Sequence, residues 1–330
     1  MLVLGIDTSC DDTSASLLSF NGEDHSILSN IVSSQNEIHD KYGGIVPELA
    51  SRRHMEMIWP VVKEALAGRE PGELGAIAVC HGPGLIGSLL VGTSFAKSIS
   101  LSTGVPFIGV NHLEGHILSA LLTEPRPSFP LLSMVVSGGH TSLYRVQGYG
   151  DYEELGRTRD DAAGEAYDKV SKLLGLGYPG GPAIDRLART GDRKAIRFPR
   201  AMMKDTHDFS FSGLKTAVRL AVEKDTSLKA EDIAAAFQDA VVDVLVKKVR
   251  LVIEETGIRS LSLSGGVAAN SELRERMAGM CQEIGAEFFP PPINLCTDNG
   301  AMIALAGFHR FRMGQTSDLG LNPRAHLPVA

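Results

Sequence analysis

The sequence predicts an α/β protein built from two halves that share the same order of elements. Residues 2–18 are typical of an apolar strand, a polar turn and a second strand, and residues 131–146 repeat that order after Pro130. Residues 75–100 indicate a strand, a glycine-rich loop and a helix, and the segment that begins at residues 261–270 has the same order. Such a repeat indicates a duplicated fold whose active cleft lies between the two halves.

This layout is similar to the fold of actin, Hsp70 and the sugar kinases, which grips a nucleotide between two such halves. By that analogy we expect an N-terminal lobe over residues 1–130 and a C-terminal lobe over residues 131–330. We expect a C-terminal helix, at about residues 300–325, to pack back onto the first lobe. The analogy predicts an architecture and does not by itself predict a reaction.

Length, composition and charge narrow the class of protein. The chain has 330 residues, 43% of them apolar, and 35 glycines, which is typical of a two-domain globular protein with many tight turns. Its net charge of -7 argues against bulk electrostatic binding of nucleic acid, so a nucleic-acid partner needs a local basic patch or a helper protein. Scattered cysteines, no signal-peptide pattern and no membrane-length apolar run predict reduced thiols in a cytoplasmic protein.

Polar residues follow the expected strands of the first half. The turn after the first strand carries Asp7, Asp11 and Asp12, which either orient a phosphate through a cation or form a hairpin rich in turn residues. The loop at residues 82–88 suits an anion at a helix N-terminus but lacks the Lys-Ser/Thr ending of a P-loop. A further strand over residues 105–110 leads directly into a pair of histidines.

His112 and His116 are the strongest candidates for metal ligands. They are four residues apart on an expected helix, so both imidazoles lie on one face and can bind the same divalent metal. Glu114 is rotated to the far side of that helix. Because Leu113 occupies the position where a zinc protease has its catalytic glutamate, a metallopeptidase is the least favoured interpretation.

Asp298 is the candidate third ligand. It directly precedes a helix expected over residues 301–311, where a carboxylate is favoured as an N-cap. As a cap it would have no further role. As a ligand it would complete a set of two histidines and one carboxylate, which leaves an open coordination position for a substrate oxygen. The sequence is compatible with both roles.

The second half contains further expected helices and a basic segment. Residues 160–174, 230–255 and 271–287 show helical spacing, and residues 178–182 form a predicted turn. Residues 185–204 hold seven Lys or Arg against two Asp, in a chain that is otherwise acidic. This segment is either a solvated face or a contact for a nucleic-acid backbone.

Eight segments, in order along nearly the whole chain, carry a resemblance to one family. They are Gly5–Thr13, Tyr42–Arg52, His112–His116, Val136–Thr141, Tyr178–Pro182, Phe209–Lys215, Ser264–Asn270 and Cys296–Gly300. These segments resemble the bacterial tRNA threonylcarbamoyladenosine transferases (the TsaD family), whose archaeal and eukaryotic relatives share the motifs. Members were formerly labelled O-sialoglycoprotein endopeptidases. The departures are small: Asp7 and Asp12 stand where many members have Glu, and Asn111 stands where many have another His.

The resemblance implies an acyltransferase that moves the threonylcarbamoyl group from threonylcarbamoyl-AMP to the exocyclic amine of adenosine 37. The substrates would be tRNAs that read codons beginning with A, and AMP would be released. The implied partners are tRNA, a TsaB-like paralogue and a TsaE-like ATPase, with no membrane. The implied cofactor is one divalent metal per subunit, Fe²⁺ or Zn²⁺, bound by His112, His116 and Asp298.

By the same resemblance, Asp11 would lie at the reacting end as the catalytic residue, and glycine-rich backbone would approach the nucleotide closely. An ATP-dependent kinase or an ATP-driven binding module is the alternative; it explains the duplicated halves but leaves the two histidines and Asp298 without a role. The residues implied to hold the adenylate donor are Val135, Val136, Ser137, Gly138, Gly139, Asp168, Gly181, Asp185 and Asn270.

Overall fold

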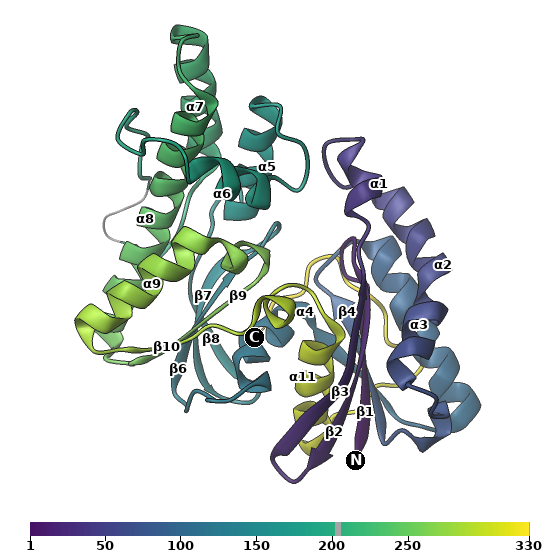
Figure 1. The fold of residues 1–330 in the computed structure, drawn as a ribbon. Coiled ribbons are helices and arrows are strands. Elements are labelled where there is room, and N and C mark those ends of the chain that lie inside the picture. Colours follow the sequence, from purple (N-terminus) through teal and green to yellow (C-terminus); the bar gives the residue numbers. More distant parts are fainter. Residues whose placement is uncertain (202–205, 330) are drawn as a thin grey trace. The chain divides into compact units, whose positions relative to one another are not determined.

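The computed structural model describes residues 1–201 and 206–329, and the chain divides into two compact units (Figure 1). Lys204, at the end of the basic segment, lies outside the described residues. The first unit comprises Met1–Arg126, Tyr149–Asp151 and Asn294–Ala330, and the second comprises Pro127–Gly148 and Tyr152–Ile293.

The first unit is built on a five-stranded sheet with the order β3-β2-β1-β4-β5. Strand β1 is antiparallel to β2 and parallel to β4, and β4 is parallel to β5. The elements of this unit are β1 (Leu2–Asp7), β2 (Thr13–Asn21), β3 (Asp24–Ser33), α1 (Asn36–Asp40), α2 (Pro47–Leu66), the 3-10 helix η1 (Pro71–Glu73), β4 (Ala76–Gly82), α3 (Ile86–Thr103), β5 (Phe107–Asn111), α4 (His112–Leu118), the 3-10 helix η2 (Ser119–Leu122) and α11 (Gly300–Arg312).

The second unit repeats this plan with a sheet of order β10-β9-β6-β7-β8. Strand β6 is antiparallel to β7 and parallel to β9, and β9 is parallel to β10, so the duplication predicted from the sequence is confirmed. Its elements are β6 (Leu131–Val136), β7 (Thr141–Gly148), β8 (Asp151–Arg157), α5 (Ala163–Leu173), α6 (Gly180–Ala188), α7 (Ser212–Lys224), α8 (Ala230–Thr256), β9 (Ser260–Ser264), the 3-10 helix η3 (Gly266–Ala269), α9 (Ser271–Ile284) and β10 (Glu287–Phe289), and α10 (Ile293–Cys296) follows where the chain returns to the first unit.

Alternation along β1 places helices on both faces of the first sheet. Leu4 and Ile6 belong to a buried cluster with residues of α2 and α3, such as Val62 and Ala96. Gly5 points to the opposite face, where α11 packs against β1, β2 and β4 (Figure 1). A Cβ on Gly5 would lie 2.0 Å from the carbonyl oxygen of Gly300, so only glycine permits this close approach of helix and strand.

Two elements differ from their expected extents. Helix α6 begins at Gly180, inside the segment predicted as a turn, because the Asp168 carboxylate accepts a hydrogen bond from the Gly180 N–H at 2.7 Å. Helix α11 ends at Arg312 and does not extend to residue 325, and Gly314 soon afterwards has a left-handed φ of 76°.

The four cysteines are free thiols, as predicted. Within the described ranges, no helix is both long and apolar enough to cross a membrane.

Candidate functional site

The two histidines and Asp298 come together in the first unit. Helix α4 follows β5 directly, and Asn111 caps it by accepting a hydrogen bond from the Leu113 N–H at 2.8 Å. The His112 and His116 rings lie 4.7 Å apart between centroids. Asp298 Oδ1 lies 3.1 Å from His116 Nε2 and 3.6 Å from His112 Nε2. The three potential ligand atoms lie within 4.8 Å of one another, so these residue types at this spacing fit a divalent metal.

The start of α11 distinguishes the two interpretations of Asp298. The N-cap of this helix is Asn299, whose Oδ1 accepts a hydrogen bond from the Met302 N–H at 3.0 Å. The N-cap position is thus occupied by Asn299, and the Asp298 carboxylate lies beside the histidines.

Glu114 lies away from the histidine nitrogens, as its position on the helix predicts. It is 1% exposed, and its carboxylate pairs with Arg310 Nε of α11 at 2.5 Å. Leu113 is buried and carries no titratable group. Among the described residues, Leu113 and Glu114 therefore do not provide the base that a zinc protease carries on this helix.

Several carboxylates around the histidines shift one another's pKa values. Burial raises the pKa of Asp11, and the negative charge of Asp298 raises it further. Burial together with the charges of Asp11 and Asp298 raises the pKa of Asp12 to about 7. Burial opposes protonation of His112, but Asp298 and Asp7 outweigh it and raise the pKa of this imidazole. A bound divalent cation would offset this concentration of negative charge.

The turn that carries Asp11 is held by His54, a residue of α2 that sequence reasoning did not assign to the site. His54 is fully buried, and its Nε2 lies 3.0 Å from the carbonyl oxygen of Cys10. Its Nδ1 lies 2.8 Å from the hydroxyl of Thr13, so α2 contacts the turn on both sides of Asp11. The distance between Asp11 and α2 in sequence explains why no local pattern indicated this contact.

The glycine-rich loops of the second unit follow two neighbouring parallel strands. Val135 and Val136 end β6 beside β9, so the loop that begins at Ser137 and the loop that begins at Gly265 leave the same edge of the sheet. Gly265 has a φ of 93°, and a Cβ there would lie 2.4 Å from the Val136 carbonyl oxygen. Gly138 and Gly139, by contrast, are exposed, and no described atom lies within 4 Å of a Cβ added to either, which leaves space for a ligand on that side.

The remaining adenylate candidates lie on α5, α6 and at the start of α9. Asp168 binds the N-terminus of α6, and Gly181 is the second residue of that helix. Asp185, one turn further along α6, accepts a hydrogen bond from the Ser271 hydroxyl at 2.9 Å. Asn270 caps α9 by accepting a hydrogen bond from the Leu273 N–H at 2.9 Å.

Gln238 connects two of these candidates and was not indicated by the sequence. It lies on α8 and is 2% exposed. Its Oε1 accepts a hydrogen bond from Asn270 Nδ2 at 2.7 Å, and its Nε2 donates to Asp185 Oδ1 at 3.3 Å. The predicted site residues thus form two groups, with the histidines, Asp298 and Asp11 in the first unit and the adenylate candidates in the second.

Comparisons of the whole chain identify similar folds. It is similar to HypF from T. kodakarensis, with a TM-score of 0.67 at 15% identity, covering 95% of this chain and 48% of that one. It is also similar to the activator of the 2-hydroxyisocaproyl-CoA dehydratase from Clostridium difficile, with a TM-score of 0.56 at 16% identity, covering 96% and 97% of the two chains. At these identities the likeness shows the fold alone, a two-lobed fold of the actin type, as predicted.

Sequence comparisons identify closer relatives. A protein named tRNA N6-adenosine threonylcarbamoyltransferase from Thermodesulfovibrio yellowstonii is 55% identical over the full length of both chains. A protein of the same name from Symbiobacterium thermophilum is 52% identical, covering 97% of this chain and 95% of that one. The model of the TsaD family, tRNA N6-adenosine threonylcarbamoyltransferase, matches residues 26–305. The chain therefore belongs to the tRNA N6-adenosine threonylcarbamoyltransferase family.

Proposed function

We propose that this chain transfers the threonylcarbamoyl group of L-threonylcarbamoyladenylate to the exocyclic amine of adenosine 37 in tRNAs that read ANN codons. A bond forms between that nitrogen and the carbamoyl carbon, and the bond from this carbon to the phosphate oxygen of AMP breaks. The amine loses a proton, and AMP leaves with the bonding electrons. Family membership supports the acyltransferase class, and the observation that carries the proposal is the set of His112, His116 and Asp298 assembled across a separation of 182 residues.

We propose that this set binds one Fe²⁺ or Zn²⁺. Two imidazoles and one carboxylate suit both metals, and the three ligand atoms already lie close to one another without any rearrangement of the backbone. When bound, the metal would supply Lewis-acid polarisation of the threonylcarbamoyl group. The chain contributes a rigid frame for the ligands, because α4 and α11 both pack on the same sheet.

Asp11 is the proposed catalytic residue. Burial and the charge of Asp298 raise its pKa, so its carboxylate holds a proton more readily than an exposed Asp does. A base with a pKa nearer to the working pH is better suited to accept the proton that the amine loses. His54 fixes the turn on both sides of Asp11 and thereby limits the directions in which the carboxylate can point.

The second unit is proposed to bind the adenylate donor. The open space beside the exposed Gly138 and Gly139 supports a close approach of the nucleotide to this loop. Asp168 and Asp185 are held in place by hydrogen bonds to their own unit, which favours a preformed site. We propose that the lobes correspond to residues 1–130 and 131–330, with α11 added to the first.

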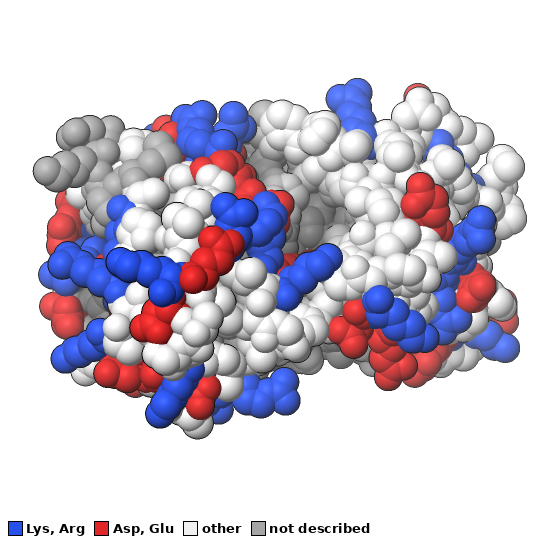
Figure 2. Space-filling view, turned by 90° about the horizontal axis from the view of Figure 1, so that it is seen from above, with Lys and Arg blue, Asp and Glu red and all other residues white. Residues whose placement is uncertain are grey.

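We propose that tRNA binding requires helper proteins, namely a TsaB-like paralogue and a TsaE-like ATPase, and that the chain works in the cytoplasm. The chain has a net charge of -7, and three arginines of its basic segment are paired with carboxylates. On the face drawn in Figure 2, basic and acidic side chains are intermixed. Such a surface attracts a polyanion weakly. The three pairs are Arg189–Asp185, Arg193–Glu272 and Arg200–Asp239.

Reconstitution tests the proposal. The chain is mixed with threonylcarbamoyl-AMP and unmodified tRNA, with and without the partner proteins, and the modified nucleoside and AMP are measured by mass spectrometry. His112→Ala should abolish both bound metal and transfer, whereas His326→Ala, which changes an exposed histidine, should affect neither. Full transfer by His112→Ala in metal-free buffer would refute the proposed metal site. Release of phosphate or a phosphorylated product in place of AMP would favour an ATP-dependent kinase.

A further inference from the structure

We propose that Asp7 is a positioning residue for the metal ligand His112, which it holds in the tautomer whose Nε2 lone pair is free to bind a metal. This inference rests on the proposed metal site. It adds to that site a residue of the first strand, which is not one of the three proposed ligands His112, His116 and Asp298.

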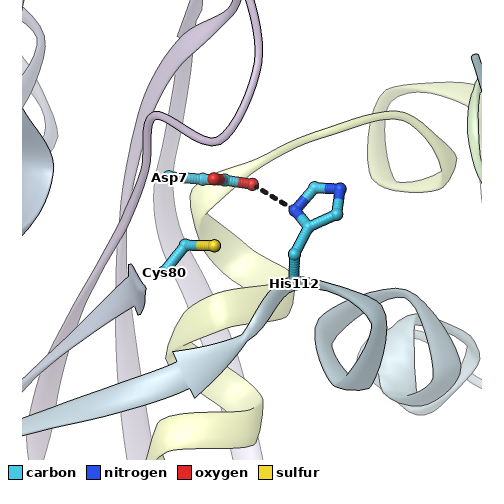
Figure 3. A group of neighbouring side chains, drawn as sticks. All are labelled: Asp7, Cys80 and His112. Carbon is cyan, nitrogen blue, oxygen red and sulfur yellow. Dashed lines mark hydrogen bonds and ion pairs between the residues drawn. The ribbon is translucent and has the colours of Figure 1, made fainter. Parts of the chain in front are cut away.

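The strand order explains why these side chains meet. Strands β1, β4 and β5 are parallel neighbours, with Ile6 opposite Val79 and Cys80 opposite Val110. Their carboxyl ends therefore lie at one edge of the sheet. Asp7 is the last residue of β1, Cys80 lies near the end of β4, and His112 is the first residue after β5. Figure 3 shows the three side chains directed at the same small space.

The contacts of Asp7 use both of its carboxylate oxygens. Oδ2 lies 3.0 Å from His112 Nδ1, and Oδ1 accepts a hydrogen bond from the Ser9 N–H at 2.8 Å (Figure 3). The Ser9 hydroxyl lies 3.1 Å from the same Nδ1. Asp7 is fully buried and His112 is 5% exposed, so bulk water does not compete for these contacts.

These contacts decide the tautomer of the neutral ring. A carboxylate oxygen can only accept a hydrogen bond, so the proton must lie on Nδ1 of His112. The lone pair then lies on Nε2, the nitrogen that faces Asp298 at 3.6 Å. A ligating histidine held in this way by a carboxylate is a common device for orienting the ring and raising its basicity.

His116 provides an internal contrast. Its Nε2 also faces Asp298, but its buried Nδ1 has no hydrogen-bond partner among the described residues. A carboxylate thus meets Nδ1 in His112, whereas Nδ1 of His116 meets none among the described residues. We therefore expect a change at Asp7 to act on the histidine ligands through His112 and not through His116.

Asp7, Cys80 and His112 also resemble a metal site of their own. The potential ligand atoms of Asp7, Cys80 and His112 also lie within 4.8 Å of one another, so they could hold a metal themselves. Both Asp7 oxygens already accept hydrogen bonds, and the fully buried Cys80 thiol donates to the Gly82 carbonyl oxygen at 4.0 Å. We infer that Cys80 packs beside the imidazole as a protonated thiol.

Zinc affinity of the full-length chain tests the inference. The metal-free protein is titrated with Zn²⁺ against a chromophoric chelator, for the parent and for Asp7→Asn, Cys80→Ala and Asp24→Asn. Asp24 has a 91% exposed side chain and serves as the matched control. Asp7→Asn should weaken zinc binding by about 10- to 100-fold, because the amide can donate to Nδ1 and favour the wrong tautomer. The other two variants should stay within about twofold of the parent on the same scale, since they leave His112 and its carboxylate unchanged.

A spectroscopic readout does not depend on any substitution at Asp7. In long-range ¹H–¹⁵N spectra of the zinc-loaded parent, the ring of His112 should carry its proton on Nδ1 and bind zinc through Nε2. Zinc bound through Nδ1, or an Asp7→Asn affinity equal to that of the parent, would overturn the inference. A loss in Cys80→Ala as large as that in Asp7→Asn would overturn it in favour of a site at Asp7, Cys80 and His112. Zinc binding that His116→Ala leaves unchanged would instead overturn the proposed metal site itself.

Discussion

Substitution of Gly5 by alanine should damage the metal centre without touching any of its residues. The new Cβ would lie 2.0 Å from the Gly300 carbonyl oxygen and 2.5 Å from the Ala304 amide nitrogen. Ordinary contact begins near 3.4 Å, so α11 must retreat by about 1.4 Å (3.4 − 2.0) or the strand must yield by a similar amount. Asp298 lies two residues before Gly300 and would move with the start of this helix.

This displacement should lower both the free energy of unfolding and the affinity for zinc. Overpacking of a tight helix–strand contact typically costs about 1–3 kcal/mol of the free energy of unfolding. Metal–ligand distances tolerate only about 0.2 Å, so a shift of Asp298 by more than this should weaken zinc binding by about tenfold or more, equivalent to about 1.4 kcal/mol. The expected signature of Gly5→Ala is therefore a joint loss of stability and of metal affinity.

The single tryptophan of the chain provides the assay. Trp59 lies on α2 in the first unit, so its fluorescence during urea denaturation reports the unfolding of that unit. Zinc affinity is measured separately by chelator competition. Gly72→Ala is the matched control, because no described atom lies within 4 Å of a Cβ there and the change in the unfolded chain is the same. If Gly5→Ala matched this control in both measurements, the proposed coupling between helix packing and the metal centre would be incorrect.

Three further outcomes are expected. Gln238→Leu removes the nearer acceptor of the Asn270 amide and should weaken AMP binding in calorimetry by about 5- to 150-fold, or about 1–3 kcal/mol, whereas Gln282→Leu, an exposed change on α9, should not. Burial lowers the pKa of His309 to about 4, so the stability that depends on its neutral form is complete above about pH 6.5 and is lost as the pH falls toward 4, by up to about 3 kcal/mol. Denaturation curves of His309→Phe should lack this loss, and parallel pH profiles of the two proteins would contradict it. In a gel-shift assay the isolated chain should bind tRNA weakly and in a salt-sensitive way; tight binding at high salt would argue against a need for helper proteins.

The sequence predicted those features whose geometry depends on short spacings. His112 and His116 face the same way because four residues make about one helical turn, and the repeated order of strands and loops predicted two similar sheets. Asp298 could not be assigned from its position alone, since a cap and a ligand both suit the start of a helix. The structure separates the two roles by one residue, because Asn299 provides the cap.

Sequence patterns did not predict contacts between segments that are far apart in the chain. Gln238 is one polar residue in a helix of 27, and its role depends on α6 and α9 reaching it from both sides. The bond between Asp7 and His112 joins residues 105 apart and depends on the order of β1, β4 and β5 in the sheet. Helix α6 begins at a Gly-Gly-Pro segment with poor helical propensity, and it begins there because a carboxylate from α5 binds its first N–H.

The packing of α11 on β1 has a consequence for biosynthesis. Domains generally fold as the chain emerges from the ribosome, and the first strand emerges almost three hundred residues before the helix that covers one face of its sheet. Until that helix emerges, the sheet face that α11 will bury is exposed to solvent or bound by a chaperone. Until residue 298 has been synthesised, the proposed metal site has its two histidines but lacks its carboxylate, so metal loading of this site is expected to be among the last steps of maturation.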